Sequence, residues 1–200
     1  MGSSPRCGEA YHICPKLSCR KRNMEIHRRG PERRPYPAPR KNVLMLSCMD
    51  LRLIDDLGQF MEGDNLINRY DQLVFAGAAL GVMQPTHVAW REVFFQHLDI
   101  AVQLHDIHDV YIMEHRNCGA YSHFLGPQFE FSDTLEGQNA EEEAHRKYAG
   151  LLRDEIIEHC ELRKAQGGKP ELWDLNVRCF LVDLRGSVRM LITDGENYDF

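Results

Sequence analysis

The chain has 200 residues, of which 43% are hydrophobic and 27% are charged, and its formal net charge is −6 at pH 7. These proportions are those of a one-domain globular protein, and they exclude a chain that is disordered throughout. The longest apolar run, residues 43–49, is much shorter than the roughly 18 residues of a membrane-spanning helix, so we expect no membrane partner.

The charges are divided unevenly along the chain. Residues 1–41 carry a net charge of +8 and the remainder carries −14. An acidic body argues against nucleic acid as a partner. Within the basic part, the prolines of residues 28–40 (RRGPERRPYPAPR) oppose both helices and sheet ladders. We therefore expect residues 1–40 to be a basic, Pro/Arg-rich tail, disordered or arm-like, and residues 41–200 to form a single domain.

The cysteine content bears on the cellular compartment. Seven cysteines, an odd number, in a chain whose residues 1–15 show no secretory signal are typical of a reducing environment. We therefore expect a cytoplasmic location. Targeting to an organelle is an alternative, because the tail is rich in arginine and poor in acids, as transit peptides are. A start at Met24, with residues 1–23 as an over-called extension, is another alternative.

The first half of the body alternates between strand and helix patterns. Residues 43–47 (VLMLS) predict a buried strand, and residues 72–75 (QLVF) predict a second one. Between them, residues 51–61 have a helical apolar period, with Asp50 in the N-cap position. The inward-facing stripe of this helix is expected to comprise Leu53, Ile54, Leu57 and Phe60.

The second half continues the alternation and ends in a hairpin. Helices are predicted over residues 86–104 and 140–164, with a third strand at residues 109–113. Residues 176–183 and 188–192 predict an antiparallel hairpin. The inward residues of the first of these helices are expected to be Val93, Phe94, His97, Leu98, Ala101 and Leu104, and those of the second Tyr148, Leu151, Leu152, Ile156 and Ile157.

This order of elements predicts the fold class. Strands that are separated by helices pair in parallel. We expect an α/β fold with a mostly parallel central sheet, flanked by helices, and a C-terminal antiparallel hairpin.

Two short motifs stand at the C-terminal ends of predicted strands, where open α/β sheets place their sites. Residues 48–52 (CMDLR) leave the first strand, and residues 115–119 (HRNCG) leave the third. If these strands are neighbours, Cys48, His115 and Cys118 converge. Two thiolates and one imidazole suit tetrahedral zinc, with the fourth position left open in a catalytic site. The sequence therefore predicts a zinc site in the domain of residues 41–200.

The first motif also supplies a carboxylate and a guanidinium. Asp50 stands two residues after Cys48, within reach of the fourth zinc position or of a water bound there. Arg52 is placed to pair with Asp50, which would keep the carboxylate ionised and oriented. Whether Asp50 lies on the metal, closing the site, or beside it stays open at this point.

Together, C-x-D-x-R and H-x-x-C-G resemble the β-class carbonic anhydrases, most widely the small, compact branch of that family. The resemblance covers residues 41–125 and, more loosely, the hairpin. It includes residues 62–64 (EGD), which match the family's turn before the second strand. Ala76 and Gly77 match part of the family's Arg-Asn-Ala-Gly segment.

The resemblance implies a role for each of these residues. Cys48, His115 and Cys118 would hold Zn²⁺, with Asp50 as the fourth ligand in a closed state. Asp50 and Arg52 would be the catalytic pair that gates the fourth position. The residues of the substrate pocket would be Ala76, Gly77 and Gly119.

The resemblance also implies an activity and an assembly. The activity is the reversible hydration of CO2 to bicarbonate, a lyase reaction in which a zinc-bound hydroxide attacks CO2. The assembly is a homodimer or a higher even oligomer, with the site near the subunit interface. Two alternatives stay open: a carbonyl sulfide or carbon disulfide hydrolase on the same zinc site, and a non-catalytic, zinc-stabilised regulatory module.

Three departures from the family's pattern favour these alternatives. Glu114 replaces the usual glycine before the histidine, and Val74-Phe75 replace Arg-Asn, which would make the pocket wall more apolar. The glutamine that many members carry upstream of the first cysteine is missing at residues 37–40. We expect Glu114 to be an exposed charge at the strand end, the alternative being a carboxylate that supports His115 or Arg116.

The remaining chemistry-bearing residues have simpler explanations. Cys160 and Cys179 lie in apolar stretches and are expected to fill the core. Trp90 and Trp173 are expected to be packing anchors. The histidines outside the motif, of which His123 is nearest in sequence, are expected to be solvent-facing or satisfied in the core, with proton transfer as the alternative.

Overall fold

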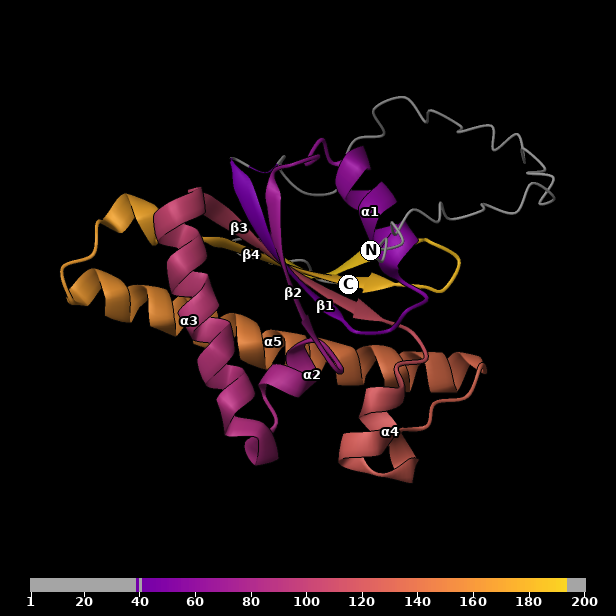
Figure 1. Cartoon of the computed structure of the whole chain (residues 1–200). Coiled ribbons are helices and arrows are strands. Elements are labelled where there is room, and N and C mark those ends of the chain that lie inside the picture. The colour runs from indigo at the N-terminus through magenta and orange to yellow at the C-terminus, as the bar shows by residue number, and fades with distance from the viewer. Residues whose placement is uncertain (1–38, 40, 194–200) are drawn as a thin grey trace, which may run out of the picture. The chain divides into compact units, whose positions relative to one another are not determined.

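The computed structural model describes residue 39 and residues 41–193, and the predicted tail otherwise lies outside the described residues. Its five strands form one sheet in the order β2-β1-β3-β4-β5 (Figure 1). β1 pairs in parallel with β2 and β3, β3 pairs in parallel with β4, and β4 and β5 are antiparallel. The strands are β1 (Asn42–Cys48), β2 (Tyr70–Phe75), β3 (Ile107–His115), β4 (Asn176–Val182) and β5 (Val188–Thr193). The predicted fold class is confirmed, including the C-terminal hairpin.

Helices cover both faces of this sheet. α1 lies on one face, where the Phe60 ring packs against Tyr111 of β3 and Phe180 of β4. α2, α3 and α5 contact one another on the other face (Figure 1). The α-helices are α1 (Ile54–Gly63), α2 (Ala79–Val82), α3 (Val88–His105), α4 (Gly119–Leu125) and α5 (Leu135–Ala165), and the 3₁₀ turns are Pro85–His87, Pro127–Phe129 and Pro170–Leu172.

The core is densest along the central strands. Six of the seven residues of β1 and eight of the nine of β3 are buried, because helices cover both faces of these strands. This explains why the sequence of β1 is an apolar run rather than an alternation. Trp173, Cys160 and Cys179 are buried, as predicted. None of the described helices is both long enough and apolar enough to cross a bilayer.

The predicted start of α1 is wrong. The helix begins at Ile54, and its N-cap residue, Leu53, makes no side-chain capping bond. Asp50 does not cap it, because Oδ1 of Asp50 accepts hydrogen bonds from the backbone and the side chain of Arg52 instead. Ile54, expected to face inward, is 69% exposed, and Met61 is buried in the core instead. Five residues, 49–53, separate the strand from the helix, and the buried stripe of the helix runs through Leu57 and Met61.

The prediction for α3 is half right. Phe94, Leu98 and Ala101 are buried against β1, β2 and β3, together with Val102. Three residues expected to face inward are exposed, namely Val93, His97 and Leu104. With exposed Ile100 they follow the spacing i, i+4, i+7 and i+11, which places them on one face of the helix. The helix therefore carries two apolar stripes, and periodicity alone does not say which of them packs on the sheet.

The long helix α5 starts five residues earlier than predicted. Oγ1 of Thr134 accepts a hydrogen bond from the backbone N–H of Gly137 at 3.2 Å and so caps the first turn. Leu152 and Ile156 are buried as predicted, whereas Leu151 is 44% exposed. Glu141 and His145, which lie within the predicted range, are also buried.

Candidate metal centre

The site is built where β1 and β3 end side by side. These strands are parallel neighbours, so Cys48 at the end of β1 and His115 at the end of β3 reach the same edge of the sheet. Cys118 is the N-cap residue of α4, one turn beyond His115. One ligand atom from each of these three buried residues lies within 4.8 Å of the other two. The convergence expected from neighbouring strands is therefore present.

The two cysteines form a close sulfur pair. Their Sγ atoms are 3.9 Å apart, and Sγ of Cys48 also accepts a hydrogen bond from the Gly77 N–H at 3.2 Å. The bond between the thiols lowers the pKa of Cys48 and raises that of Cys118. Zn–S bonds of about 2.3 Å at a tetrahedral angle place two sulfurs about 3.8 Å apart. The spacing of the cysteines fits a shared zinc ion.

The imidazole of His115 presents one free nitrogen to this pair. Nδ1 of His115 lies 2.9 Å from the carbonyl oxygen of Arg116, which can only accept, so the proton is on Nδ1. Nε2 is buried and has no hydrogen-bond partner. A buried imidazole nitrogen without a partner, facing two thiols, is what a bound metal would satisfy. The donor set and its geometry fit zinc.

Asp50 and Arg52 lie beside the three candidate ligands. Arg52 Nε is 2.9 Å from Asp50 Oδ1, and Nη2 is 2.6 Å from Oδ2. These hydrogen bonds lower the pKa of Asp50 to about 2. Nη2 of Arg52 also donates to the carbonyl of Asn117 at 3.2 Å, and Oδ2 of Asp50 is 4.0 Å from Nε2 of His115. Arg52 thus holds the carboxylate next to the cluster.

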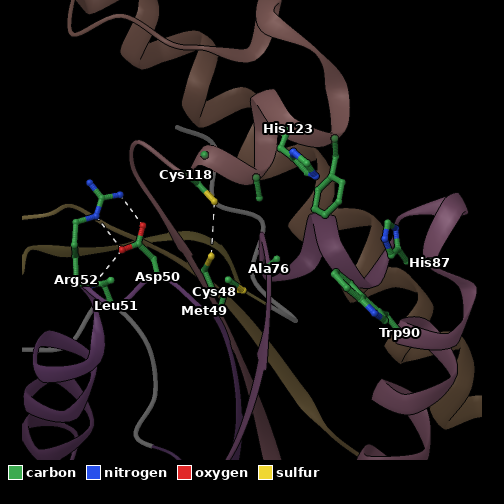
Figure 2. A pocket seen from close by; sticks show the side chains of 13 residues that line it. Cys48, Met49, Asp50, Leu51, Arg52, Ala76, His87, Trp90, Cys118 and His123 are labelled. Atoms are coloured by element: carbon green, nitrogen blue, oxygen red, sulfur yellow. Dashed lines mark hydrogen bonds and ion pairs between the residues drawn. The ribbon is translucent and has the colours of Figure 1, made fainter.

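A cavity of about 730 Å³ adjoins the two cysteines. Figure 2 shows Cys48 and Cys118 facing each other, with the Asp50–Arg52 pair on one side and an aromatic wall on the other. The wall includes His87 and Trp90, whose ring centroids are 4.5 Å apart. The residues lining the cavity are Cys48, Met49, Asp50, Leu51, Arg52, Ala76, His87, Trp90, Cys118, Gly119, Ala120, His123 and Phe124.

The predicted pocket residues have different positions. Ala76 and Gly119 line the cavity, whereas Gly77 does not and instead contacts Cys48 through its N–H. Val74 and Phe75 are also absent from the described lining, although the Phe75 ring packs on Trp90 at 5.9 Å. The apolar wall therefore comes from Trp90 and its neighbours. Of the two residues that replace Arg-Asn, Phe75 packs behind Trp90 and does not line the cavity.

The expectation that Glu114 is an exposed charge is wrong. Its side chain is 1% exposed, and it accepts hydrogen bonds from the backbone of Ala79 at 3.0 Å and the hydroxyl of Tyr121 at 3.2 Å. Nδ1 of His145 is 2.8 Å from Oε2 of the same carboxylate. The alternative reading is also incorrect in its partners, because Arg116 pairs with Glu141 instead. Glu114 anchors α2, α4 and α5 to β3.

Sequence reasoning missed two groups of residues around the site. Trp90 was expected only to pack, but it lines the cavity together with His87 and Phe124. No local signal marks these residues, because the turn before α3 and the end of α4 meet only in the folded chain. Glu141 was also missed, because it lies 24 residues beyond the turn that it contacts.

The comparison with protein families agrees with the two motifs. Residues 38–133 match the profile of a family described as "Putative carbonic anhydrase". Both motifs lie within the matched residues, and the match confirms the β-carbonic-anhydrase-like family that they predict. Two curated relatives are uncharacterized proteins. One, from Rickettsia conorii, is 27% identical over 150 residues, covering 75% of this chain and 72% of its own. The other, from Rickettsia bellii, is 26% identical over 150 residues, covering 75% and 81%.

Similar solved structures include carbonic anhydrases. The enzyme from Streptococcus mutans is 19% identical, with a TM-score of 0.42, covering 77% of this chain and 83% of its own. The β-carbonic anhydrase CafD of Aspergillus fumigatus is 16% identical, with a TM-score of 0.49, covering 80% and 92%. Similarity this low carries no inference about substrate or assembly, which must be argued from the chain's own residues.

Proposed function

We propose that this protein catalyses the zinc-dependent reversible hydration of CO2 to bicarbonate. One observation carries the proposal. Sγ of Cys48, Sγ of Cys118 and the unpartnered Nε2 of His115 converge beside an Asp50–Arg52 pair at the edge of an apolar cavity. A zinc site that served only to stabilise the fold would need neither the cavity nor the oriented carboxylate.

The chemistry divides between the metal and the chain. Zinc held by Cys48, His115 and Cys118 would lower the pKa of a water ligand towards about 7, which supplies a nucleophile at neutral pH. The chain's own task is to accept a hydrogen bond from that nucleophile and to aim it. Asp50 is suited to this, because its carboxylate only accepts hydrogen bonds when ionised. Its pKa of about 2 keeps it ionised at all working pH values.

Arg52 would keep Asp50 off the metal. Its two hydrogen bonds occupy both carboxylate oxygens, and its third, to the carbonyl of Asn117, fixes the guanidinium against the ligand turn. A carboxylate held in this way favours the open form of the site over the closed form. We therefore propose that Asp50 orients the nucleophile and that Arg52 orients Asp50.

The cavity would hold the substrate and exclude water. Ala76, Ala120 and the rings of Trp90 and Phe124 give it a largely apolar lining. Such a lining suits CO2, which is neutral and has no strong hydrogen-bonding group. It suits carbonyl sulfide for the same reason, and sulfide-releasing hydrolysis of carbonyl sulfide or carbon disulfide is the second candidate function.

We further propose that the protein is a homodimer. The exposed apolar stripe on α3 supports this, with Ile100 53% and Leu104 72% exposed. At the cavity's rim, Met49 and Leu51 are 69% and 82% exposed. The cavity is much larger than a triatomic substrate, and a second subunit packed over its rim would make it narrower. The cytoplasm is the proposed location, on the odd cysteine count.

The test is stopped-flow CO2 hydration on zinc-loaded protein, with metal content measured in parallel and Cys48→Ser as the control. Fast turnover that is lost in the control, together with bound zinc, is the expected result. Stoichiometric zinc without CO2 turnover would contradict the proposal, and sulfide release from carbonyl sulfide would then identify the second candidate. Zinc without either turnover would leave the non-catalytic module.

A further inference from the structure

We propose that Glu141 is a positioning residue that holds the ligand turn, residues 115–118, in the geometry that zinc requires. The inference rests on the proposed function, because it concerns the same metal centre. Glu141 lies on α5, and its side chain is 3% exposed. It makes no hydrogen bond or ion pair with any of the three candidate ligands, so it would act through the backbone between them.

Glu141 accepts hydrogen bonds from both residues that separate His115 from Cys118. Its Oε1 accepts a hydrogen bond from the backbone N–H of Asn117 at 2.5 Å. Its Oε2 accepts one from Nη1 of Arg116 at 2.9 Å. A single buried carboxylate thus fixes both the backbone and the side chain of the turn.

The peptide unit between Arg116 and Asn117 connects Glu141 to His115. Its N–H donates to Glu141, and the C=O of the same unit accepts the hydrogen bond from Nδ1 of His115 at 2.9 Å. A peptide unit is planar, so holding its N–H also sets the direction of its C=O. That C=O keeps the proton on Nδ1 and leaves Nε2 free for the metal. Glu141 therefore selects the tautomer of His115 and the orientation of its ring.

The next peptide unit extends the effect to the catalytic pair. Asn117 has a left-handed backbone, with φ of 55°, a conformation that asparagine adopts more readily than most other residues with a side chain. Its carbonyl accepts the hydrogen bond from Nη2 of Arg52 at 3.2 Å. By fixing this turn, the carboxylate of Glu141 therefore supports two features of the site. One is the free Nε2 of His115, and the other is the carbonyl of Asn117 that accepts the hydrogen bond from Arg52.

Two substitutions separate the parts of this role. Glu141→Ala removes both acceptors and leaves the Asn117 N–H without a partner. Glu141→Gln can still accept from Asn117 but loses the ion pair with Arg116. Supporting groups behind metal ligands typically change metal affinity by about 10- to 100-fold. We expect zinc to leave Glu141→Ala about 10- to 100-fold faster than wild type. Glu141→Gln keeps one of the two acceptors, so we expect it to release zinc more slowly than Glu141→Ala but still more than about twofold faster than wild type.

The experiment measures zinc release to a coloured chelator and the visible spectrum of the Co²⁺-substituted protein. The spectrum reports the coordination geometry and is independent of turnover. Two controls on α5 test non-specific effects: Glu143→Ala removes an exposed carboxylate, and Ile156→Val trims the core away from the site. We expect both to release zinc at the wild-type rate, even though Ile156→Val lowers the melting temperature.

The outcomes separate this inference from the proposed function. A wild-type protein that binds neither zinc nor cobalt overturns both. A wild-type protein that binds zinc, with Glu141→Ala releasing it within twofold of the wild-type rate and giving an unchanged cobalt spectrum, overturns the inference alone. If Glu141→Ala does not fold, Glu141→Gln decides: a shifted cobalt spectrum with faster release supports the role, and wild-type values for both overturn it.

Discussion

Arg52 binds Asp50 at two points, with Nε 2.9 Å from Oδ1 and Nη2 2.6 Å from Oδ2. The two residues are separated by one position, so the pair is formed within the turn that leaves β1. A two-point contact fixes the plane of the carboxylate as well as its charge. The two-point geometry distinguishes this partly exposed pair from a surface ion pair with a single contact, which would contribute little.

The first prediction concerns this two-point contact. Arg52→Lys keeps the positive charge but cannot bind both oxygens in one plane. We expect kcat/KM for CO2 hydration to fall by about 100-fold, within the range typical of a displaced proton-handling group, while zinc stays stoichiometric. Stopped-flow kinetics and metal analysis check this. Arg185→Lys, at an exposed position in the β4–β5 turn, is the control. Unchanged kinetics in Arg52→Lys would contradict the gating role.

The second prediction concerns the buried carboxylate of Glu114. Glu114→Ala leaves three donors without an acceptor: the N–H of Ala79, the hydroxyl of Tyr121 and Nδ1 of His145. We expect the free energy of unfolding to drop by about 3 kcal/mol or more. Urea unfolding measures this, and exposed Glu143→Ala should stay within about 0.5 kcal/mol of wild type. A drop below 1 kcal/mol would mean that the network is not a stability determinant.

The third prediction concerns Gly77, whose N–H contacts Cys48. Its φ is +79°, and an added Cβ would lie 2.8 Å from Cβ of Ala120. Gly167 also has a positive φ, +90°, but a Cβ there would meet nothing within 4 Å. We expect Gly167→Ala to cost about 1 kcal/mol of backbone strain and Gly77→Ala clearly more, with reduced zinc binding. Equal losses of stability in urea would show that the close contact is relaxed at no cost.

The fourth prediction concerns stability at alkaline pH. Burial raises the pKa of Tyr111 far above its usual value of about 10. The unfolded state therefore loses a proton above pH 10 that the folded state keeps. This contribution to stability is complete below pH 10 and declines above it by up to about 1.4 kcal/mol per pH unit. Urea titrations at pH 9 and 11 should show a smaller decline for Tyr111→Phe than for wild type. If the free energy of unfolding declined equally in both proteins, Tyr111 would not be a source of the loss of stability at alkaline pH.

The fifth prediction concerns the exposed stripe on α3. We expect light scattering at micromolar concentration to give about twice the 23.2 kDa of one chain. Leu104→Glu places a charge on the 72% exposed position and should yield the monomer mass. Leu135→Glu, at a 76% exposed position at the start of α5, should leave the mass unchanged. A wild-type mass near 23 kDa would exclude the dimer.

Local patterns predicted most of the framework and the three candidate ligands. The strands were readable because β1 and β3 are buried on both faces and therefore apolar throughout. The ligand set followed from strand order, since parallel neighbours end at the same edge. The orientation of α3 was not readable, because Val93 and Leu104 are as apolar as the residues that pack on the sheet.

Contacts between distant segments could not be predicted from the sequence either. A glutamate at the end of a predicted strand is typical of a surface charge. Glu114 is buried because side chains from distant segments, among them His145 of α5, cover it and donate hydrogen bonds to it. Glu141 is one of several acids in a charged helix, and nothing local distinguishes it from exposed Glu143. In both cases the partner lies more than 20 residues away.

The Glu114 network also constrains how this sequence can diverge. A protein with glycine at that position has no carboxylate to satisfy, and then neither the hydroxyl of Tyr121 nor the imidazole of His145 has that acceptor. Changing one of these three side chains alone leaves the others without a partner in the core. Changing all three together leaves only the backbone N–H of Ala79 without its acceptor. Across related chains, positions 114, 121 and 145 should therefore be inherited as a set, and a phenylalanine at 121 should accompany the loss of the acid at 114.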